Sequence, residues 1–329
     1  MTLPLQDGCG RPVTYLRISI TDHCNLRCLY CTPEKPNPRL SHQHILRFEE
    51  ILVIAQTALD MGIRKIRITG GEPLIRKGVF SFLNHLGKLP GLRRLAITTN
   101  GVRLASTLNQ LEEAGVHQLN ISLDTMDPGK FARITGKDCF HTVWEGIERA
   151  VESGSFRIKL NAVALRGINE KDFLPLASLA RQWPVSVRFI EEMPIGHRHN
   201  RNHRPILVPE IRQILEPLGP LSPISSEAED GPASRFSFPG AIGEIGFIPA
   251  LSRHFCHNCN RLRLTADGRL RPCLLSDESM DIGGPLRRGV PNSRLQEILR
   301  ESLKHKGAEH HFNPESADQV DTAMIRIGG

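Results

Sequence analysis

Short apolar runs of β type alternate with segments of helical periodicity along the first two-thirds of the chain. The apolar runs predict strands at residues 13–20, 65–69, 93–99, 118–123, 157–164 and 185–190. Apolar positions at helical spacing predict helices at residues 48–61, 79–86, 104–114, 143–153 and 173–181. This alternation indicates an α/β fold with a parallel sheet of right-handed βα units. Six units form either an open doubly wound sheet or a partial (βα)6 barrel of the TIM type.

The pattern changes after about residue 193, which divides the chain into a core at 1–193 and a second region at 194–329. A helix is predicted at 208–218, and the Ser-, Pro- and Gly-rich stretch at 222–239 is typical of a linker or long loop. A strand at 243–249 and a hairpin formed by 261–265 and 269–273 follow. A helix at 293–305 precedes a polar tail.

Cysteine usage and hydropathy indicate the compartment. No apolar run among the 329 residues approaches the length of a membrane span, and the N-terminus lacks the pattern of a signal peptide. We therefore expect a cytoplasmic protein with no membrane partner. In that compartment the eight cysteines are expected to be thiols or metal ligands rather than disulfides.

The net charge of +7 suits a nucleic acid, an anionic membrane or a small molecule that carries phosphate. Aromatic residues make up only 5% of the chain and the basic residues are dispersed, which argues against a nucleic-acid reader. A phosphorylated small substrate fits this balance better.

Three cysteines lie close together in the segment Cys24-Asn-Leu-Arg-Cys28-Leu-Tyr-Cys31, directly after the first predicted strand. A closed structural zinc site needs four protein ligands, whereas a [4Fe–4S] cluster held by three leaves one iron open for chemistry. The alternatives are a zinc site completed by a distant ligand such as His23, or buried free thiols. Tyr30, between two of the cysteines, either faces the ligand of the open iron or simply packs.

A second signal is the loop Ile68-Thr-Gly70-Gly71-Glu72-Pro73, again at a strand end. Its two glycines allow a ligand to approach the backbone closely, although such a sequence standing alone is more often a turn. In βα folds the loops after the strands share one edge, so this loop and the cysteine segment are expected to lie together.

A third signal is Cys256-His-Asn-Cys259 followed by Cys273 across the predicted hairpin. This is either a second three-cysteine cluster or a zinc site completed by His254 or His257. Arg261 and Arg263 follow two residues apart on a strand and therefore face the same side. Paired guanidinium groups suit phosphate or carboxylate, and exposed basic strand residues are the ordinary alternative.

Basic residues interrupt the apolar strands, and charge is rarely buried without a partner. Unless they point outward or pair with a carboxylate, they suggest an anionic ligand inside the sheet; they are Arg17, Lys65, Arg67, Lys159 and Arg188. Thr98, Ser122 and Asp124 add polar groups at strand ends. The terminal Gly328-Gly329 is either a frayed tail or a segment able to thread a narrow cleft.

Taken together, these motifs resemble those of the radical S-adenosylmethionine enzymes, and among them the GTP 3′,8-cyclase family of molybdenum cofactor biosynthesis. The first triad alone would mark only the superfamily. The resemblance extends over nearly the whole chain through Arg67-Ile-Thr-Gly-Gly-Glu-Pro, Thr98-Thr-Asn-Gly101, Asn120-Ile-Ser-Leu-Asp124, Arg188-Phe-Ile-Glu, Cys256-x₂-Cys259-Asn-Arg-Leu-Arg263, Cys273 and the Gly-Gly end.

The resemblance implies a partial (βα)6 barrel with a C-terminal extension that binds an iron–sulfur cluster. Cys24, Cys28 and Cys31 would hold one [4Fe–4S] cluster in the barrel mouth, where S-adenosylmethionine is cleaved to a 5′-deoxyadenosyl radical. A second [4Fe–4S] cluster at the other end would hold the guanine of GTP; its ligands would be Cys256, Cys259 and Cys273. The lyase product would be (8S)-3′,8-cyclo-7,8-dihydroguanosine 5′-triphosphate.

Residue roles follow from the same resemblance. Tyr30, Gly71, Ser122 and Met193 would line the S-adenosylmethionine site. The GTP contacts would be Arg17, Arg67, Thr98, Lys159, Arg261, Leu262 and Arg263, with Lys65 and Arg188 as further phosphate contacts. Catalytic roles would fall to Arg17, Arg261, Arg263, Gly328 and Gly329. An electron donor and an enzyme that converts the cyclised GTP onward are implied partners, and a homodimer is compatible with the resemblance.

Departures from the family pattern are small: Thr32 follows the first triad, and Arg326 precedes the terminal Ile-Gly-Gly. Two rival hypotheses remain. Another two-cluster radical enzyme, such as a peptide-modifying one, commonly carries more C-terminal cysteines than this chain. A zinc protein that binds nucleic acid would explain the charge and the cysteines but not the basic strands.

Overall fold

The computed structural model describes residues 5–32, 39–193, 195, 204–225, 231–252, 256–309, 320 and 322–328. Among these residues, no helix combines the length and the apolar character needed to cross a membrane. The remaining residues, including His254 and Gly329 among those predicted to function, lie outside the described part.

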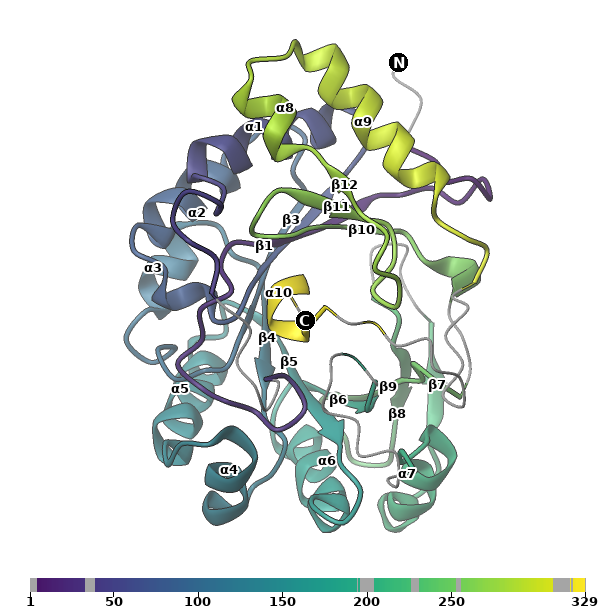
Figure 1. The fold of residues 1–329 in the computed structure, drawn as a ribbon. Coiled ribbons are helices and arrows are strands. Elements are labelled where there is room, and N and C mark those ends of the chain that lie inside the picture. Colours follow the sequence, from purple (N-terminus) through teal and green to yellow (C-terminus); the bar gives the residue numbers. More distant parts are fainter. Residues whose placement is uncertain are drawn as a thin grey trace.

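Six parallel strands form the centre of the molecule, and each pairs with the next in the sequence. They are β1 (Tyr15–Ser19), β2 (Lys65–Thr69), β3 (Arg94–Thr99), β4 (Gln118–Ser122), β5 (Arg157–Ala164) and β6 (Ser186–Glu191). In a doubly wound sheet the strand order reverses near the middle of the sheet, and no such reversal occurs among these six strands. The strands curve around a central space (Figure 1), so the partial (βα)6 barrel is confirmed and the open sheet is wrong.

The helices that connect these strands lie on the outside of the curve (Figure 1). They are α1 (Phe48–Asp60), α2 (Val79–Gly87), α3 (Leu108–Glu113), α4 (Pro128–Thr135), α5 (Phe140–Ser153) and α6 (Phe173–Gln182), with short 3₁₀ helices at Pro73–Ile75 and Glu170–Asp172. Their apolar faces form one continuous core with the outward residues of the strands. Burial of that surface, at roughly 25 cal/mol per Å², supplies the main stabilisation of the barrel.

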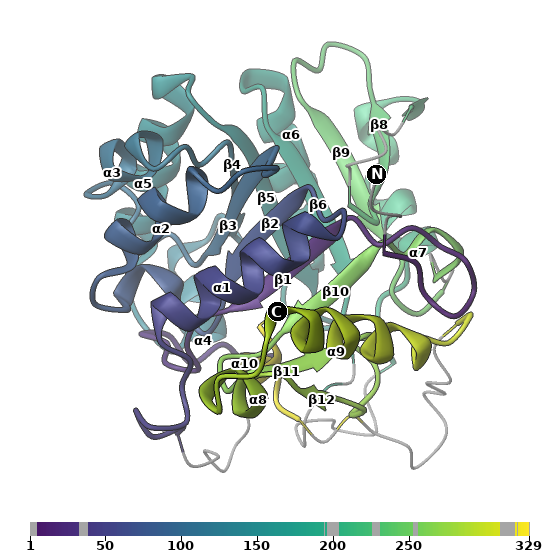
Figure 2. The same ribbon diagram turned by 90° about the horizontal axis from the view of Figure 1, so that it is seen from above.

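The described residues after 204 extend the same sheet at both of its ends (Figure 2). Beyond β6 follow β9 (Glu244–Ile248), β8 (Ser234–Ser237) and β7 (Ser222–Ile224); beyond β1 follow β10 (Arg261–Leu264), β11 (Arg269–Arg271) and β12 (Met280–Asp281). The other elements are α7 (Val208–Ile214), α8 (Gly283–Arg287), α9 (Asn292–Lys304), α10 (Met324–Ile327) and 3₁₀ helices at Glu216–Leu218 and Cys256–Asn258. The division of the chain at residue 193 stays a prediction.

The sequence prediction of a linker or long loop at 222–239 is wrong where the structure describes strands at Ser222–Ile224 and Ser234–Ser237. β7 and β8 pair antiparallel with each other, and β8 pairs with β9. Pro and Gly have little tendency to form strands, so the composition of this stretch concealed the hairpin. The strands form because the edge of β9 offers unpaired backbone groups to a neighbour.

Alternation along the strands separates an apolar outer layer from a charged inner one. In β2, Ile66 and Ile68 join the core beneath the helices, whereas Arg67 lines the central cavity. Lys65 is also buried, with its ammonium 4.9 Å from the centre of the Tyr15 ring. The barrel therefore has its apolar core outside the sheet and a basic interior within it.

Candidate active site

The first cysteine loop follows β1 and lies at the carboxyl edge of the barrel. Its neighbours fix its backbone on two sides. Gly71 N–H donates to Thr21 O at 2.6 Å and Glu72 N–H to His23 O at 2.8 Å. From the other side, Arg27 N–H donates to Thr135 O at 2.8 Å and Leu29 N–H to Ile134 O at 2.9 Å, at the end of α4. The predicted meeting of the two loops is therefore observed.

The three thiols of this loop influence one another electrostatically. Burial raises the pKa of Cys31 to about 12, with a contribution from Cys24. The pKa of Cys28 is raised well above its usual value by burial and then by Cys31. Among the described residues, no three side chains are already drawn together as metal ligands. Without a positive ion the thiols are protonated, and a bound iron cluster would stabilise the three thiolates.

The residues predicted to line the S-adenosylmethionine site meet at the same edge. Tyr30, Ser122 and Met193 line the central cavity. The Tyr30 hydroxyl donates to Asp124 Oδ2 at 2.9 Å, and burial raises the pKa of Asp124 to about 6. Asn100, which the sequence analysis did not single out, donates to Cys24 Sγ at 3.7 Å. Polar side chains from several strand ends thus lie beside the first triad.

Gly71 has no room for a side chain. A Cβ at this position would lie 2.2 Å from His23 O and 3.0 Å from Cys24 N, which are backbone atoms of the cysteine loop. We expect Gly71→Ala to displace that loop and to weaken iron binding by the first triad by about tenfold or more, because the backbone that supports its ligands moves. Iron and sulfide analysis after anaerobic reconstitution measures this effect.

The control for this prediction is Gly129→Ala on α4, where a Cβ would meet one side-chain atom of Asp127 at 3.3 Å. It should bind iron like the unaltered chain. Equal iron content in both variants would contradict the role of Gly71 as the contact point between the two loops.

The second cysteine group lies at the opposite edge of the barrel. β10 runs parallel to β1, so Cys256 and Cys259, which precede β10, lie at the amino edge. β11 returns antiparallel, with Arg263 opposite Arg271, which brings Cys273 back to the same edge. All three cysteines line the central cavity.

The charge around the second group differs from that around the first. Burial disfavours the Cys259 thiolate, but Arg261 and Lys306 outweigh burial and lower the pKa of Cys259 to about 6. The Arg261 guanidinium donates to Cys259 Sγ at 3.8 Å. Of the two histidines considered as zinc ligands, His257 is exposed and His254 lies outside the described residues.

A cavity of about 680 Å³ connects the two edges. Arg17, Arg67 and Arg263 occupy neighbouring positions in one register row across β1, β2 and β10, and all three line the cavity. Burial, followed by the nearby Arg261, lowers the pKa of Arg263 to about 10. This concentration of positive charge between two cysteine groups suits a ligand with several negative charges.

Some buried polar atoms of this interior have no hydrogen-bond partner among the described residues. They are Arg67 Nε, Thr98 Oγ1, Lys159 Nζ and Arg263 Nη1. Lys159 is 0% exposed and shares a register row with Thr98 and Asn120, both of which line the cavity. Buried donors are normally satisfied, so these atoms fit a bound anion that would accept from them.

Other predicted residues lie differently. Leu262 belongs to the apolar core outside the sheet, so any contact with a ligand must use its backbone. Arg188 lines the cavity, whereas Lys65 contacts Tyr15 instead. Asn120 and Asn161 line the cavity as well, although sequence reasoning assigned them no role. Their position on inward-facing strand sites is the signal that could have identified them.

The C-terminal tail enters the barrel mouth, where α10 lies inside the ring of strands (Figure 1). Arg17 Nη2 donates to Gly328 O at 3.5 Å. A Cβ on Gly328 would lie 2.4 Å from Thr69 Oγ1 and 2.8 Å from Ser19 Cβ, and the φ angle of Gly328 is +80°. Gly328 therefore touches the ends of β1 and β2 at the edge that carries the first triad. Gly329 lies outside the described residues.

We expect Gly328→Ala to remove the tail from the mouth, because the added methyl clashes with two strand ends and the φ angle costs a further ~1 kcal/mol. Turnover should fall by roughly tenfold or more, while iron content is unchanged, since the tail holds no cysteine. Gly289→Ala is the matched control: its φ is +72° but a Cβ there meets nothing within 4 Å. Equal turnover in both variants would contradict a role for the tail.

Comparison with known proteins identifies the class to which this chain belongs. The family model "Radical SAM superfamily" matches residues 18–180, and "Molybdenum Cofactor Synthesis C" matches residues 185–312. The barrel is similar to Streptococcus suis SuiB solved with S-adenosylmethionine, with a TM-score of 0.62 and 15% identity over 85% of this chain and 63% of that one. Fold and first cysteine loop together define a radical S-adenosylmethionine enzyme.

Sequence similarity to named proteins identifies the family within this class of enzymes. The chain is 45% identical to GTP 3′,8-cyclase of Moorella thermoacetica over 99% of this chain and 100% of that protein. It is 42% identical to human molybdenum cofactor biosynthesis protein 1 over 93% of this chain and 48% of that protein. The chain belongs to the GTP 3′,8-cyclase family.

Proposed function

We propose that this chain cyclises GTP to (8S)-3′,8-cyclo-7,8-dihydroguanosine 5′-triphosphate, the first step of molybdenum cofactor biosynthesis. The observation that carries the proposal is the single cavity lined by the arginine row, with the loop of one cysteine triad at its carboxyl edge and the other triad at its amino edge. Membership of the family supports the same reaction.

In this proposal Cys24, Cys28 and Cys31 hold a [4Fe–4S] cluster at the carboxyl edge. S-adenosylmethionine, cleaved reductively at that cluster, would supply the radical that starts the cyclisation. The chain positions this cofactor with the Gly71 backbone and with Tyr30, Ser122 and Met193. Tyr30 is itself oriented by its bond to Asp124.

The second triad of Cys256, Cys259 and Cys273 would hold a [4Fe–4S] cluster that faces the guanine. The triphosphate would lie against Arg17, Arg67 and Arg263, with Thr98 and Lys159 beneath it. Arg261, beside Cys259, would join the two parts of the GTP site. A polyanion bound there would offset the mutual repulsion of these buried cations.

The residues at the carboxyl edge would also shield the reaction from water. The tail closes part of the mouth through Arg17 and Gly328, and Gly328 packs directly on Ser19 and Thr69. Exclusion of water protects reactive carbon centres from side reactions. Reductive cleavage of S-adenosylmethionine requires an external electron donor, and we expect a separate enzyme to convert the product onward.

Turnover of GTP with S-adenosylmethionine under anaerobic, reducing conditions tests the proposal. We expect 5′-deoxyadenosine and the cyclised nucleotide to form in equal amounts, with ATP a poor substitute for GTP. If 5′-deoxyadenosine forms but no cyclised nucleotide is produced from GTP, the result would instead favour another radical enzyme, such as a peptide-modifying one.

A further inference from the structure

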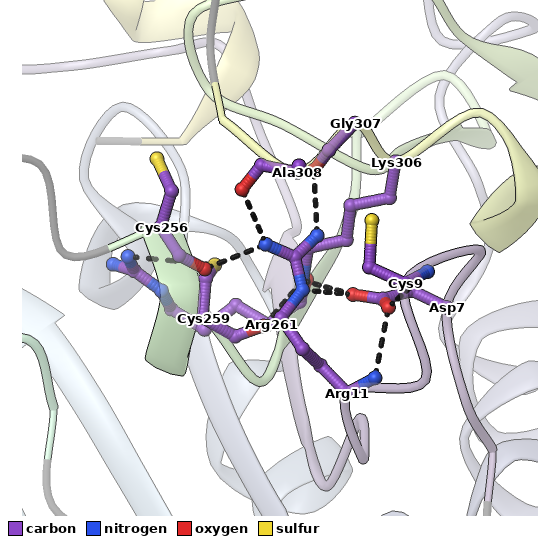
Figure 3. A network of polar contacts seen from close by, with 9 residues as sticks. All are labelled: Asp7, Cys9, Arg11, Cys256, Cys259, Arg261, Lys306, Gly307 and Ala308. Atoms are coloured by element: carbon purple, nitrogen blue, oxygen red, sulfur yellow. Dashed lines mark hydrogen bonds and ion pairs between the residues drawn. The ribbon is translucent and has the colours of Figure 1, made fainter.

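Two cations from distant parts of the chain bind the backbone of the second cysteine loop (Figure 3). Arg11 Nη1 donates to Cys256 O at 2.6 Å. Lys306 Nζ donates to Cys259 O at 2.7 Å and to Arg261 O at 2.9 Å. The carbonyls of both neighbouring cysteines are thus held by charged donors, which make stronger hydrogen bonds than neutral ones.

Asp7 connects these two cations. Its Oδ2 accepts from Arg11 Nε at 2.6 Å and lies 3.9 Å from Lys306 Nζ. Its Oδ1 accepts from the backbone N–H groups of Cys9 and Arg11, both at 3.0 Å. Figure 3 shows the carboxylate and the two cations converging beside the cysteine loop. Asp7 therefore fixes the orientation of the side chains that hold the loop.

This group is buried and carries an excess of positive charge. The exposed side-chain fractions are 0% for Asp7, 11% for Arg11 and 4% for Lys306. One carboxylate faces two cations directly, and Arg261 adds a third positive charge beside Cys259. Burying an uncompensated charge is costly, so an anion beside the group would offset that cost.

The remaining bonds of Arg11 tie the loop to the end of α9. Arg11 Nη1 also donates to Ala308 O at 2.7 Å and Nη2 to Gly307 O at 2.6 Å. The N-terminal segment itself is anchored by Leu5 N–H to Met61 O at 3.0 Å and by Gly8 N–H to Leu303 O at 3.3 Å. The charged group is thus connected to α9 and to the segment that follows it.

We propose that Asp7, Arg11 and Lys306 are positioning residues for the second cysteine triad: they hold Cys256 and Cys259 in place and supply positive charge that stabilises a bound [4Fe–4S] cluster. This inference rests on the proposed function, which puts a cluster there. Three thiolates and the cluster core carry net negative charge, which increases on reduction. Net charge near a cluster sets its reduction potential, so this group should raise the potential of the second cluster.

The test uses the full-length chain with Cys24→Ala, Cys28→Ala and Cys31→Ala, so that only the second triad binds iron. In this background, Lys306→Met should lower the midpoint potential, measured by a titration followed by electron paramagnetic resonance. Iron retention against a chelator should weaken by about tenfold or more. Lys306→Arg should restore both values. Lys304→Met, at the exposed last residue of α9 and two residues before Lys306, is the matched control and should change neither.

Asp7→Asn tests whether the charge of this group, and not only its structural support, affects the midpoint potential of the second cluster. Because it removes the negative charge, it should shift the midpoint potential upward, opposite to Lys306→Met. If Lys306→Met does not fold, Asp7→Asn and Arg11→Lys test the inference in its place. Arg11→Lys keeps the positive charge but loses the hydrogen bonds to three carbonyls. Arg11→Lys should weaken iron retention with little change in potential.

Potentials that do not move in opposite directions for Asp7→Asn and Lys306→Met, or iron retention in Lys306→Met equal to that in Lys304→Met, would overturn the inference. A parent variant that binds no cluster through Cys256, Cys259 and Cys273 would instead contradict the proposed function, and this inference with it.

Discussion

Lys159→Met is expected to stabilise the ligand-free protein and to weaken GTP binding by about ten- to a hundredfold. Lys159 is fully buried, and its Nζ has no hydrogen-bond partner among the described residues. Burial, followed by repulsion from Arg188, Arg67 and Lys65, lowers its pKa to about 5. A charge-assisted hydrogen bond to phosphate contributes about 1.5–3 kcal/mol, which gives the expected loss of affinity.

The pH dependence of stability follows from the same shift. Between pH 5 and the usual lysine pKa of roughly 10.4, the unfolded chain binds a proton that the folded chain does not. Stability of the ligand-free protein should therefore rise with pH over this range. Lys159→Met lacks this pH dependence. Its free energy of unfolding should therefore exceed that of the unaltered chain most near pH 5, and the difference should shrink as pH rises.

Urea unfolding at several pH values and calorimetric GTP titration in two buffers measure both effects. The unaltered chain should also take up a proton on binding GTP, because the phosphate raises the pKa of Lys159. Lys88→Met, an exposed position at the end of α2, is the control. Affinity for GTP equal to that of the control would remove Lys159 from the substrate site.

The double substitution of Arg261→Ala and Arg263→Ala is expected to reduce GTP turnover by at least two orders of magnitude, roughly a hundredfold or more, while the first cluster remains assembled. Arg261 contacts Cys259 Sγ, and Arg263 extends the row formed by Arg17 and Arg67. Loss of two charge-assisted contacts at about 1.5–3 kcal/mol each predicts a decrease of roughly a hundredfold to ten-thousandfold. β10 remains, because Leu262 and Leu264 supply its core contacts.

Iron analysis and the two products separate the possible outcomes. The variant should keep its first cluster and cleave S-adenosylmethionine slowly while forming little cyclised nucleotide. Arg269→Ala, an exposed arginine on β11 that bonds to Ser279, should turn over GTP normally. Persistent turnover in the double variant would show that the GTP site is not where we propose it.

The barrel itself was predictable because its strands and helices have distinct periodicities. The strands at 65–69 and 157–164 were predicted with their observed bounds, and the other four core strands differ by one or two residues at their ends. In contrast, α4 was missed. Asp127, which caps its first turn by accepting from Lys130 N–H at 2.8 Å, and Pro128 after it were the local signals for that helix.

The cysteine groups were predictable from spacing, but the partners that hold them were not. Arg11 and Lys306 reach the second loop from 245 and 47 residues away in sequence. Sequence periodicity carries no information about such contacts, since tertiary packing creates them. The position of β10 beside β1, which makes the second region part of the barrel, likewise depends on pairing between distant strands.

The central claim is that the two triads have different tasks, one in radical formation and the other in holding GTP. Its most direct test compares the reconstituted chain with a variant carrying Cys256→Ala, Cys259→Ala and Cys273→Ala, by counting iron and sulfide and assaying both products. We predict two [4Fe–4S] clusters, about eight irons, in the unaltered chain and one cluster in the variant. Both proteins should cleave S-adenosylmethionine, and only the unaltered chain should cyclise GTP. Stoichiometric zinc in the unaltered chain, or cyclised nucleotide from the variant, would contradict the claim.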